Sequence, residues 1–284
     1  MPLPAASRWR RSTRPSCSAA STRWCTTCAC RTSTVTFALD RAGLVGADGA
    51  THQGLYDIAY LRCLPNMVLM APKDENELRH MLRTAIEHPG PAALRYPRGE
   101  AVGVPLEEPA LPLPIGKGEL LRGDLTTDGL VENGAAGREI DVALVALGNM
   151  VYPALAAAAL LEREGISVAV VNARFTKPID RDLLVSISHR CRRIVTVEEH
   201  VLAGGFGESV LALLEEEKGT GRIPAIDVRR IGLPDQFIEH GAQRILREKL
   251  GLDAERIAAS VLDFVKLGIG ASPQNEDRAI RLGK

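Results

Sequence analysis

From residue 35 onward, apolar runs of about five residues alternate with amphipathic segments. Runs of this length that end at Gly or Pro predict buried strands, and the segments between them predict helices. Asp74, with Glu77 three residues later, has the capping-box pattern of a helix start. This alternation predicts a parallel sheet with crossover helices. The expected elements are strands over 35–39, 67–71 and 92–96, and helices over 55–62 and 74–87.

A second unit of the same α/β class begins near Ile140, after a segment rich in Pro, Gly and acidic residues. Residues 116–138 are expected to form a linker, and the polar tail over 269–284 is expected to be disordered. The unit itself, residues 139–268, is predicted to be a second α/β domain. Its expected strands cover 140–148, 166–173, 193–199 and 223–234, and its expected helices cover 151–164, 181–188, 207–217, 242–250 and 254–266.

The overall composition narrows the classes of partner. Lys plus Arg and Asp plus Glu are both 35, so the bulk charge does not indicate a nucleic-acid partner. No apolar run approaches the roughly 20 residues of a membrane-spanning helix, so no membrane partner is expected. Outside residues 1–34 only Cys63 and Cys191 remain, which favours a reduced, cytoplasmic protein.

Residues 1–34 differ sharply from the rest of the chain. They contain six Arg, no Lys, twelve Ser or Thr, four of the six Cys and no acidic residue. Three interpretations are open: an organelle transit peptide, a metal site built on Cys25, Cys28 and Cys30, or a reading-frame artefact. A metal is not predicted, because no second cluster of ligands follows downstream.

The loop that follows the first predicted strand carries the richest set of reactive side chains. Arg41, Asp48 and His52 lie within twelve residues of one another, in the Gly-rich stretch 40–54. Ligands of open parallel sheets bind at the carboxyl ends of the strands, where this loop is expected. The alternative is that His52 is a hydrogen-bonded loop histidine without a catalytic role.

A second cationic segment is RYPRG, where Arg95 and Arg98 follow the end of another predicted strand. The planar guanidinium group donates two hydrogen bonds at once to a phosphate. Arginines on neighbouring strand ends could therefore clamp a sugar phosphate. The alternative is that Arg41 and Arg98 only pair with acidic side chains at the surface.

The Gly-rich turn after His200 resembles a phosphate-binding loop only superficially. It has neither the G-x-G-x-x-G spacing nor the Lys of a P-loop. Nucleotide binding is therefore not expected there, and Met67, Met70 and Met81 are expected to fill the core.

Several long motifs together resemble one enzyme family. They are FALDRAGLVGADGATHQGLYDIAYLRCLPNMVLMAPKDENELRHML, GPAALRYPRG, RFTKPID, TVEEHVLAGGFGESV and IGLPDQFIEHG. They are similar to 1-deoxy-D-xylulose-5-phosphate synthases, which are transketolase-like enzymes that depend on thiamine diphosphate and Mg²⁺. Members condense pyruvate with glyceraldehyde 3-phosphate and release carbon dioxide. The resemblance runs from about Val35 to about Leu267.

This resemblance implies roles for the loop residues and a domain layout. Arg41 and Arg98 would hold the substrate phosphate, while Asp48 and His52 would be catalytic residues of the acceptor site. Residues 35–115 would be the distal part of the pyrimidine-binding domain, and 139–268 the transketolase C-terminal domain. The latter would serve folding and homodimer formation more than chemistry.

The resemblance also implies what is missing. The family's G-D-G…N motif for Mg²⁺ and diphosphate does not occur in the sequence, and the Glu that activates the aminopyrimidine ring would precede residue 1. No residue is therefore assigned to the cofactor or to a metal, and the chain is expected to be inactive alone. The alternatives are one half of a split thiamine-diphosphate enzyme or a non-catalytic dimerisation module.

The family likeness favours the reading-frame interpretation of residues 1–34. A family-like stretch, YSTFLQ, written in GC-rich codons and read one base out of register, gives Thr13–Cys17. A second stretch, VHDVCL, similarly gives Cys25–Ala29. We therefore expect a frameshift near codon 34 and no ordered structure before it.

Overall fold

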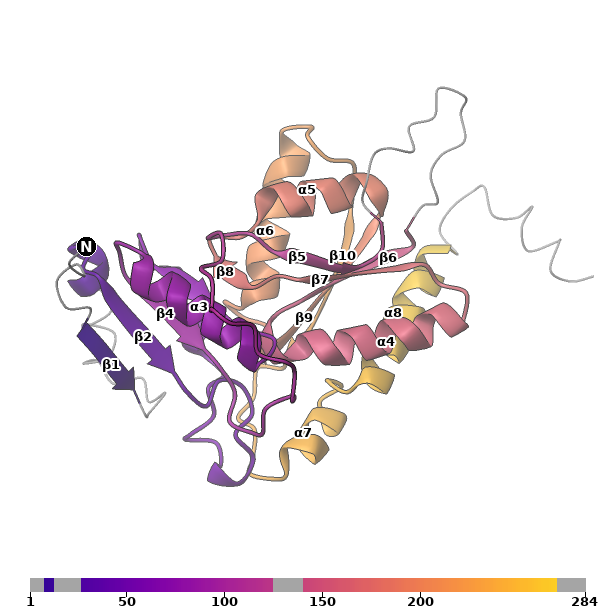
Figure 1. Cartoon of the computed structure of the whole chain (residues 1–284). Helices are drawn as coiled ribbons and strands as arrows, with labels where there is room; N and C mark the ends of the chain where they lie inside the picture. Colours follow the sequence, from indigo (N-terminus) through magenta and orange to yellow (C-terminus); the bar gives the residue numbers. More distant parts are fainter. Residues whose placement is uncertain (1–7, 13–26, 125–139, 270–284) are drawn as a thin grey trace, which may run out of the picture.

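The computed structural model describes residues 8–12, 27–124 and 140–269, and it contains two five-stranded sheets. Figure 1 shows the two sheets side by side, the first mostly in indigo and violet and the second mostly in pink and orange. Within the described residues, no helix is both long and apolar enough to cross a membrane.

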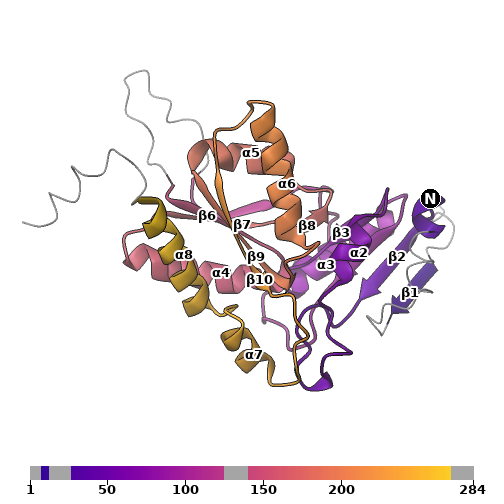
Figure 2. The same cartoon turned by 180° about the vertical axis from the view of Figure 1, so that it is seen from behind.

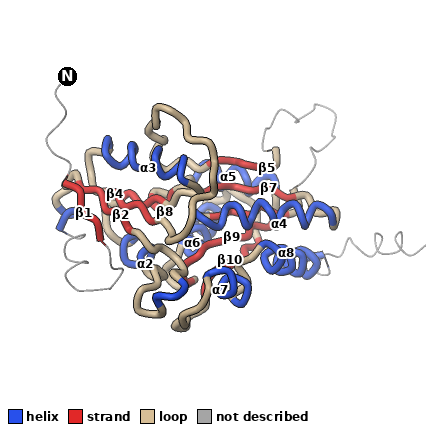
Figure 3. Tube along the Cα trace, turned by 60° about the horizontal axis from the view of Figure 1, so that its bottom comes forward, coloured by secondary structure: helices blue, strands red, loops and turns tan. Residues whose placement is uncertain are grey.

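The first sheet has the strand order β1-β2-β4-β3-β8. Its first four strands are parallel, and β8 pairs antiparallel with β3. In Figure 3, α3 and α2 lie on opposite sides of this sheet. The strands are β1 (Arg8–Ser12), β2 (Val35–Leu39), β3 (Val68–Met70), β4 (Ala92–Arg95) and β8 (Phe175–Lys177), and the helices are α2 (Asp57–Arg62) and α3 (Glu75–Glu87).

The second sheet has the order β10-β9-β6-β7-β5, with β5 antiparallel at its edge. Figure 2 shows α5 and α6 on one face and α4 and α8 on the other. Strands covered on both faces must be apolar throughout, and every residue of β6 and β7 is buried. The strands are β5 (Glu119–Arg122), β6 (Val142–Ala146), β7 (Val168–Asn172), β9 (Arg193–Val201) and β10 (Asp227–Leu233). The helices are α4 (Val151–Arg163), α5 (Arg181–Arg190), α6 (Phe206–Gly219), α7 (Gln243–Lys249) and α8 (Ala254–Ile269).

The start of α3 shows how the sequence sets an element boundary. The Asp74 side chain accepts a hydrogen bond from Glu77 N at 2.8 Å. In return, the Glu77 carboxylate accepts from Lys73 N at 2.7 Å, one residue earlier than in the usual capping box. The predicted helix start is therefore confirmed, with a shifted return bond.

The predicted α/β class and its parallel sheets are confirmed, and Met67, Met70 and Met81 are buried core residues as expected. Three strands were not assigned from the sequence. β5 lies inside residues 101–138, which were expected to be a linker that is partly strand, although no bounds were expected for that strand. Residues 125–138 lie outside the described residues.

The other two unpredicted strands extend the first sheet. β1 lies within residues 1–34, and residues 27–30 form a helical turn, so the expectation of no ordered structure is wrong for both. Residues 1–7 and 13–26 lie outside the description. β8 belongs by sequence to the second unit but completes the first sheet. Of the expected tail, residue 269 ends α8 and 270–284 lie outside the described residues.

A buried cluster of charged side chains joins the two units. Arg95, at the end of β4, donates from Nε to Asp57 Oδ2 at 2.8 Å, and both side chains are 3% exposed. Its NH2 group donates to Gly54 O at 3.3 Å and to Glu199 O at 3.4 Å. Arg95 thereby links the first sheet, α2 and strand β9 of the second sheet.

Two neighbouring groups on β9 have strongly shifted pKa values. Burial raises the pKa of Glu198 to about 7, although its carboxylate accepts hydrogen bonds from the backbone of Phe206 and Gly207. Burial, assisted by Arg95, lowers the pKa of His200 to about 4. The folded protein therefore favours the uncharged form of both groups near pH 5 to 6.

These two shifts act on stability in opposite directions. Glu198 binds its proton more tightly when folded, so its contribution to stability is lost as pH rises from 4.5 to about 7. His200 binds its proton less tightly when folded, so its contribution is lost as pH falls from 6.5 to about 4. Relative to wild type, Glu198→Gln should gain up to about 3 kcal/mol of unfolding free energy between pH 4.5 and 7.

The companion variant His200→Gln should instead lose stability relative to wild type as pH rises from 4 to 6.5. Urea unfolding at half-unit pH steps measures both differences, and any pH-independent cost of a substitution appears as a constant offset. Difference curves that stay flat across these windows would show that the two groups do not titrate as described.

The strand β8 also fastens the second unit to α2. Lys177 Nζ donates to Arg62 O at 2.9 Å and to Leu64 O at 2.6 Å, where α2 ends. Lys177→Met should lower the unfolding free energy by about 1–3 kcal/mol, because two carbonyl groups lose a charged donor. Lys218→Met is the matched control, since Lys218 pairs only with exposed Glu215, and it should change stability by less than about 0.5 kcal/mol. Equal effects of the two substitutions in urea unfolding would contradict this assignment.

Candidate functional site

The loop between β2 and α2 is folded back on itself by backbone hydrogen bonds. Gly43 and Gly54 exchange two of them, at 2.8 and 3.0 Å, and Ala42 N donates to Tyr96 O at 3.0 Å. Arg41 has a positive φ of 61°, which turns the chain directly after the strand. The loop is therefore tied to the end of β4, where the second cationic segment begins.

Three of the four predicted site residues meet at this point. Arg41 Nη1 lies 2.8 Å from Asp48 Oδ2, and Arg98 Nη1 lies 2.6 Å from Asp48 Oδ1. The two arginines arrive from β2 and β4, which are neighbours in the sheet. The Arg98 hydrogen bond, together with both guanidinium charges, holds the pKa of Asp48 below its usual range. Asp48 itself ends a short 3₁₀ turn, η1 (Gly46–Asp48).

The pairing also agrees with the alternative that Arg41 and Arg98 only form ion pairs with acidic side chains at the surface. Each contact, however, uses a single nitrogen of a guanidinium group that carries five N–H donors. The side chains of Arg41 and Arg98 are 34% and 49% exposed. Two partly exposed guanidinium groups that share one carboxylate leave a net positive charge at the strand ends, which suits a phosphate group.

The fourth predicted residue, His52, lies on the same loop but makes a different contact. Its Nδ1 lies 3.0 Å from Thr51 Oγ1, and its charge contributes to the lowered pKa of Asp48. The structure thus brings Arg41, Asp48 and Arg98 into direct contact and leaves His52 beside them.

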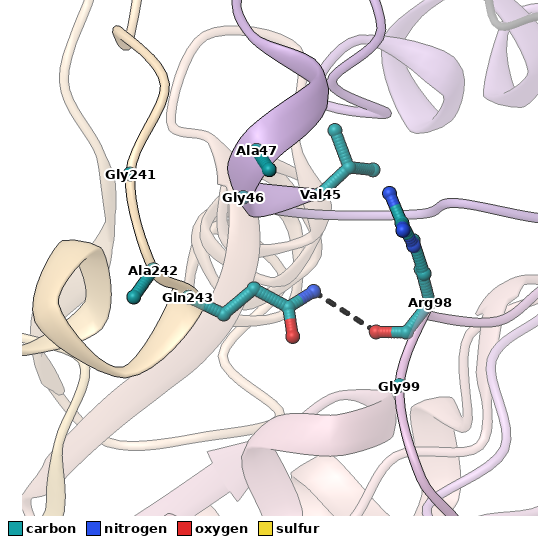
Figure 4. Close-up of a pocket in the computed structure, with 8 residues that line it drawn as sticks. All are labelled: Val45, Gly46, Ala47, Arg98, Gly99, Gly241, Ala242 and Gln243. Atoms are coloured by element: carbon teal, nitrogen blue, oxygen red, sulfur yellow. Dashed lines mark hydrogen bonds between the residues drawn. The ribbon is translucent and has the colours of Figure 1, made fainter.

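The C-terminal unit contributes one wall of the site, which the sequence did not predict. A pocket of about 410 Å³ lies beside Arg98 and is closed on one side by α7 (Figure 4). Gln243, the first residue of α7, donates from Nε2 to Arg98 O at 2.9 Å. The residues that line the pocket are Val45, Gly46, Ala47, Arg98, Gly99, Gly241, Ala242 and Gln243. The sequence signal for this wall was the IGLPDQFIEHG motif, which precedes α7.

A second contact from the C-terminal unit lies beneath the loop. Glu199 is bound by Arg247 at 2.6 Å and by Asn149 at 2.6 Å. A Cβ atom at Gly43 would lie 2.2 Å from Glu199 Oε2, and Gly43 has a φ of +78°. Glycine is therefore required at this position by both space and backbone conformation.

The Gly-rich turn after β9 does not fit a phosphate group. The backbone N–H groups of Phe206 and Gly207 at the start of α6 already donate to Glu198, at 2.6 and 2.7 Å. A diphosphate would have to displace this buried carboxylate. Over residues 27–124 and 140–269, no group of three or more His, Cys, Asp or Glu side chains could hold a metal ion.

Comparison with known families divides the chain in the same way as the structure. Residues 25–102 match the pyrimidine-binding domain of transketolase, and residues 136–257 match the transketolase C-terminal domain. A structure described as a split gene transketolase, inactive beta4 tetramer, is 34% identical, with a TM-score of 0.66. The alignment covers 82% of this chain and 67% of that one. A transketolase from Campylobacter jejuni, 17% identical with a TM-score of 0.63, shares the fold over 90% of this chain and 35% of its own.

Curated relatives are more similar in sequence but much longer. The 1-deoxy-D-xylulose-5-phosphate synthase 1 of Geobacter metallireducens is 56% identical over 232 residues, which are 82% of this chain and 34% of that protein. The corresponding synthase of Heliobacterium modesticaldum is 54% identical over 224 residues, 79% of this chain and 32% of that protein. The chain thus spans about a third of the length of the curated relatives it matches. It belongs to the transketolase family and is a homologue of the 1-deoxy-D-xylulose-5-phosphate synthases.

Proposed function

We propose that the chain supplies the acceptor half of a 1-deoxy-D-xylulose-5-phosphate synthase, the part that binds glyceraldehyde 3-phosphate for condensation with pyruvate. The observation that carries this proposal is the meeting of Arg41 and Arg98 on Asp48, at the ends of neighbouring parallel strands. Two converging guanidinium groups suit a phosphate monoester, which carries up to two negative charges. The similarity to synthases over four fifths of the chain gives the same substrate class.

Each of the four side chains has its own role in binding or in proton transfer. Arg41 and Arg98 turn their donors from Asp48 to the incoming phosphate, which offers a stronger charge and more acceptor oxygens. Asp48, whose pKa the two arginines hold below its usual range, then accepts hydrogen bonds from the hydroxyl group of the substrate. His52, beside them, donates a proton to the carbonyl oxygen of the acceptor aldehyde, which becomes a hydroxyl group as the new carbon–carbon bond forms and the C=O π bond breaks.

Thiamine diphosphate and Mg²⁺ would be held by a part of the enzyme other than the residues described above, because the turn at α6 is filled by Glu198. We propose that the working assembly is a cytoplasmic homodimer and that the chain alone is inactive.

A split enzyme is a second candidate for the working assembly. The 34% identical structure covers the same two domains and is described as a split gene transketolase in an inactive tetramer of one chain type. By analogy, a separate chain with a G-D-G…N motif would bring the cofactor to this one. If the chain is instead a non-catalytic dimerisation module, replacement of Arg98 would not change the KM for any substrate.

The test combines this chain with a chain that carries the diphosphate-binding domain of a relative, in the presence of thiamine diphosphate and Mg²⁺. Synthase activity should require both chains. In that mixture Arg98→Met should raise KM for glyceraldehyde 3-phosphate by about 10- to 100-fold, because charge-assisted bonds to the phosphate are lost. KM for pyruvate should change little.

Arg244→Met is the matched control, since the Arg244 side chain on α7 is 83% exposed and pairs only loosely with Glu248. It should leave both KM values unchanged. Activity of this chain alone, or calorimetric binding of thiamine diphosphate to it in the micromolar range, would contradict the assignment of the cofactor to another part. An unchanged KM in Arg98→Met would contradict the acceptor site.

We also propose that residues 1–34 arise from a frameshift near codon 34 in the gene. The steep change of composition at this point supports the proposal. Resequencing the DNA should place a family-like reading frame one base out of register upstream of that codon. An uninterrupted frame with no such slip would reject it.

A further inference from the structure

The amide of Gln243 bonds to both loops of the proposed acceptor site. Its Nε2 donates to Leu44 O at 2.6 Å and to Arg98 O at 2.9 Å. Leu44 belongs to the loop that carries Arg41 and Asp48, while Arg98 follows β4. Figure 4 shows the Gln243 side chain reaching across the pocket toward the Arg98 carbonyl. A side chain of the C-terminal unit thus fixes the two backbones that carry the guanidinium groups.

The segment before Gln243 is itself anchored to the same loop. Gly241 N donates to Gly46 O at 3.2 Å. Gln53 Nε2 donates to Ile238 O at 3.0 Å, and its Oε1 accepts from Val45 N at 3.2 Å. The position of Gln243 is therefore set by a network that includes the buried Gln53, and its two hydrogen bonds are not those of a loose surface side chain.

The guanidinium groups depend on these backbones for their spacing. The Arg98 side chain is 49% exposed, and its ion pair is with Asp48, a group on the opposite loop. A phosphate that draws both arginines away from Asp48 weakens the side-chain link between the loops. The Gln243 bridge does not involve Asp48, so the departure of the arginines from that carboxylate leaves its two hydrogen bonds unchanged.

We propose that Gln243 is a positioning residue that sets the separation of Arg41 and Arg98 and so selects acceptors that carry a phosphate group. The inference rests on the proposed function of the same site. Its requirement is chemical: residue 243 must donate hydrogen bonds to two carbonyl oxygens. Lysine has donors to meet that requirement, whereas methionine, of similar length, has none.

The test is an NMR titration of the full chain with D-glyceraldehyde 3-phosphate, which measures its dissociation constant. D-glyceraldehyde is the unphosphorylated comparison. Gln243→Met should weaken binding of the phosphorylated compound on the order of tenfold, the effect of two lost hydrogen bonds. Gln243→Lys should stay within about threefold of wild type. Binding of D-glyceraldehyde should change in neither variant.

Two further variants separate the possible results. Gln236→Met, at an exposed position of the same connecting segment, should bind like wild type. Arg98→Met should abolish the preference for the phosphorylated compound. If wild type and Arg98→Met bind it equally, the proposed function fails and the inference fails with it. If Arg98→Met loses binding while Gln243→Met does not, the inference alone is overturned.

A positioning role also differs from simple support of the fold. Circular dichroism and thermal unfolding should show that Gln243→Met is folded at the temperature of the titration. Should that variant not fold, Gln243→Glu replaces it, since it has the same length but no donor when ionised. Binding by Gln243→Lys as weak as by the variants without a donor would refute the requirement for donation.

Discussion

The loop over residues 40–54 depends on one buried ion pair, between Arg95 and Asp57. The pair is 3% exposed on both sides, and Arg95 also donates to the carbonyl groups of Gly54 and Glu199. Removal of one partner from such a pair leaves an uncompensated buried charge, which costs about 3–5 kcal/mol. The pair fixes where the loop ends, how α2 begins and how β9 approaches the first sheet.

Two arginines of one pentapeptide therefore have opposite roles. Arg95 and Arg98 in RYPRG both lie at the end of a predicted strand, and the sequence pattern alone does not distinguish their roles. Arg95 still lies in the sheet, in register with Leu39, and points into the junction between the units. Pro97 follows the strand and lies among the residues of a pocket of about 650 Å³ that Arg98 also lines. The two arginines differ in burial, and the burial of Arg95 depends on its ion-pair partner Asp57, 38 residues earlier in the chain.

The sequence predicted elements well where the signal is local. The long apolar runs of β6 and β7 and the Asp74 cap of α3 are complete within a few residues. β8 has only three residues, and its stability as a strand comes from pairing with β3, more than 100 positions away in the chain. β5 is a similar case, because it is an edge strand held by β7 within a segment rich in turn-forming residues. A local pattern cannot report pairing of this kind.

The difference between local signals and long-range contacts also explains which part of the candidate site could be predicted from the sequence. Arg41, Asp48 and Arg98 lie at the ends of strands that the pattern identified, so the rule for parallel sheets brought them together. Gln243 lies 199 residues from Leu44, and an amide side chain on an amphipathic helix gives no signal of its own. The C-terminal unit was expected to serve folding and dimer formation. Because its Gln243 donates hydrogen bonds to the main chain of both loops, the packing of this unit against the first sheet also determines the shape of the proposed phosphate site. The two units therefore form this site together, as one structure.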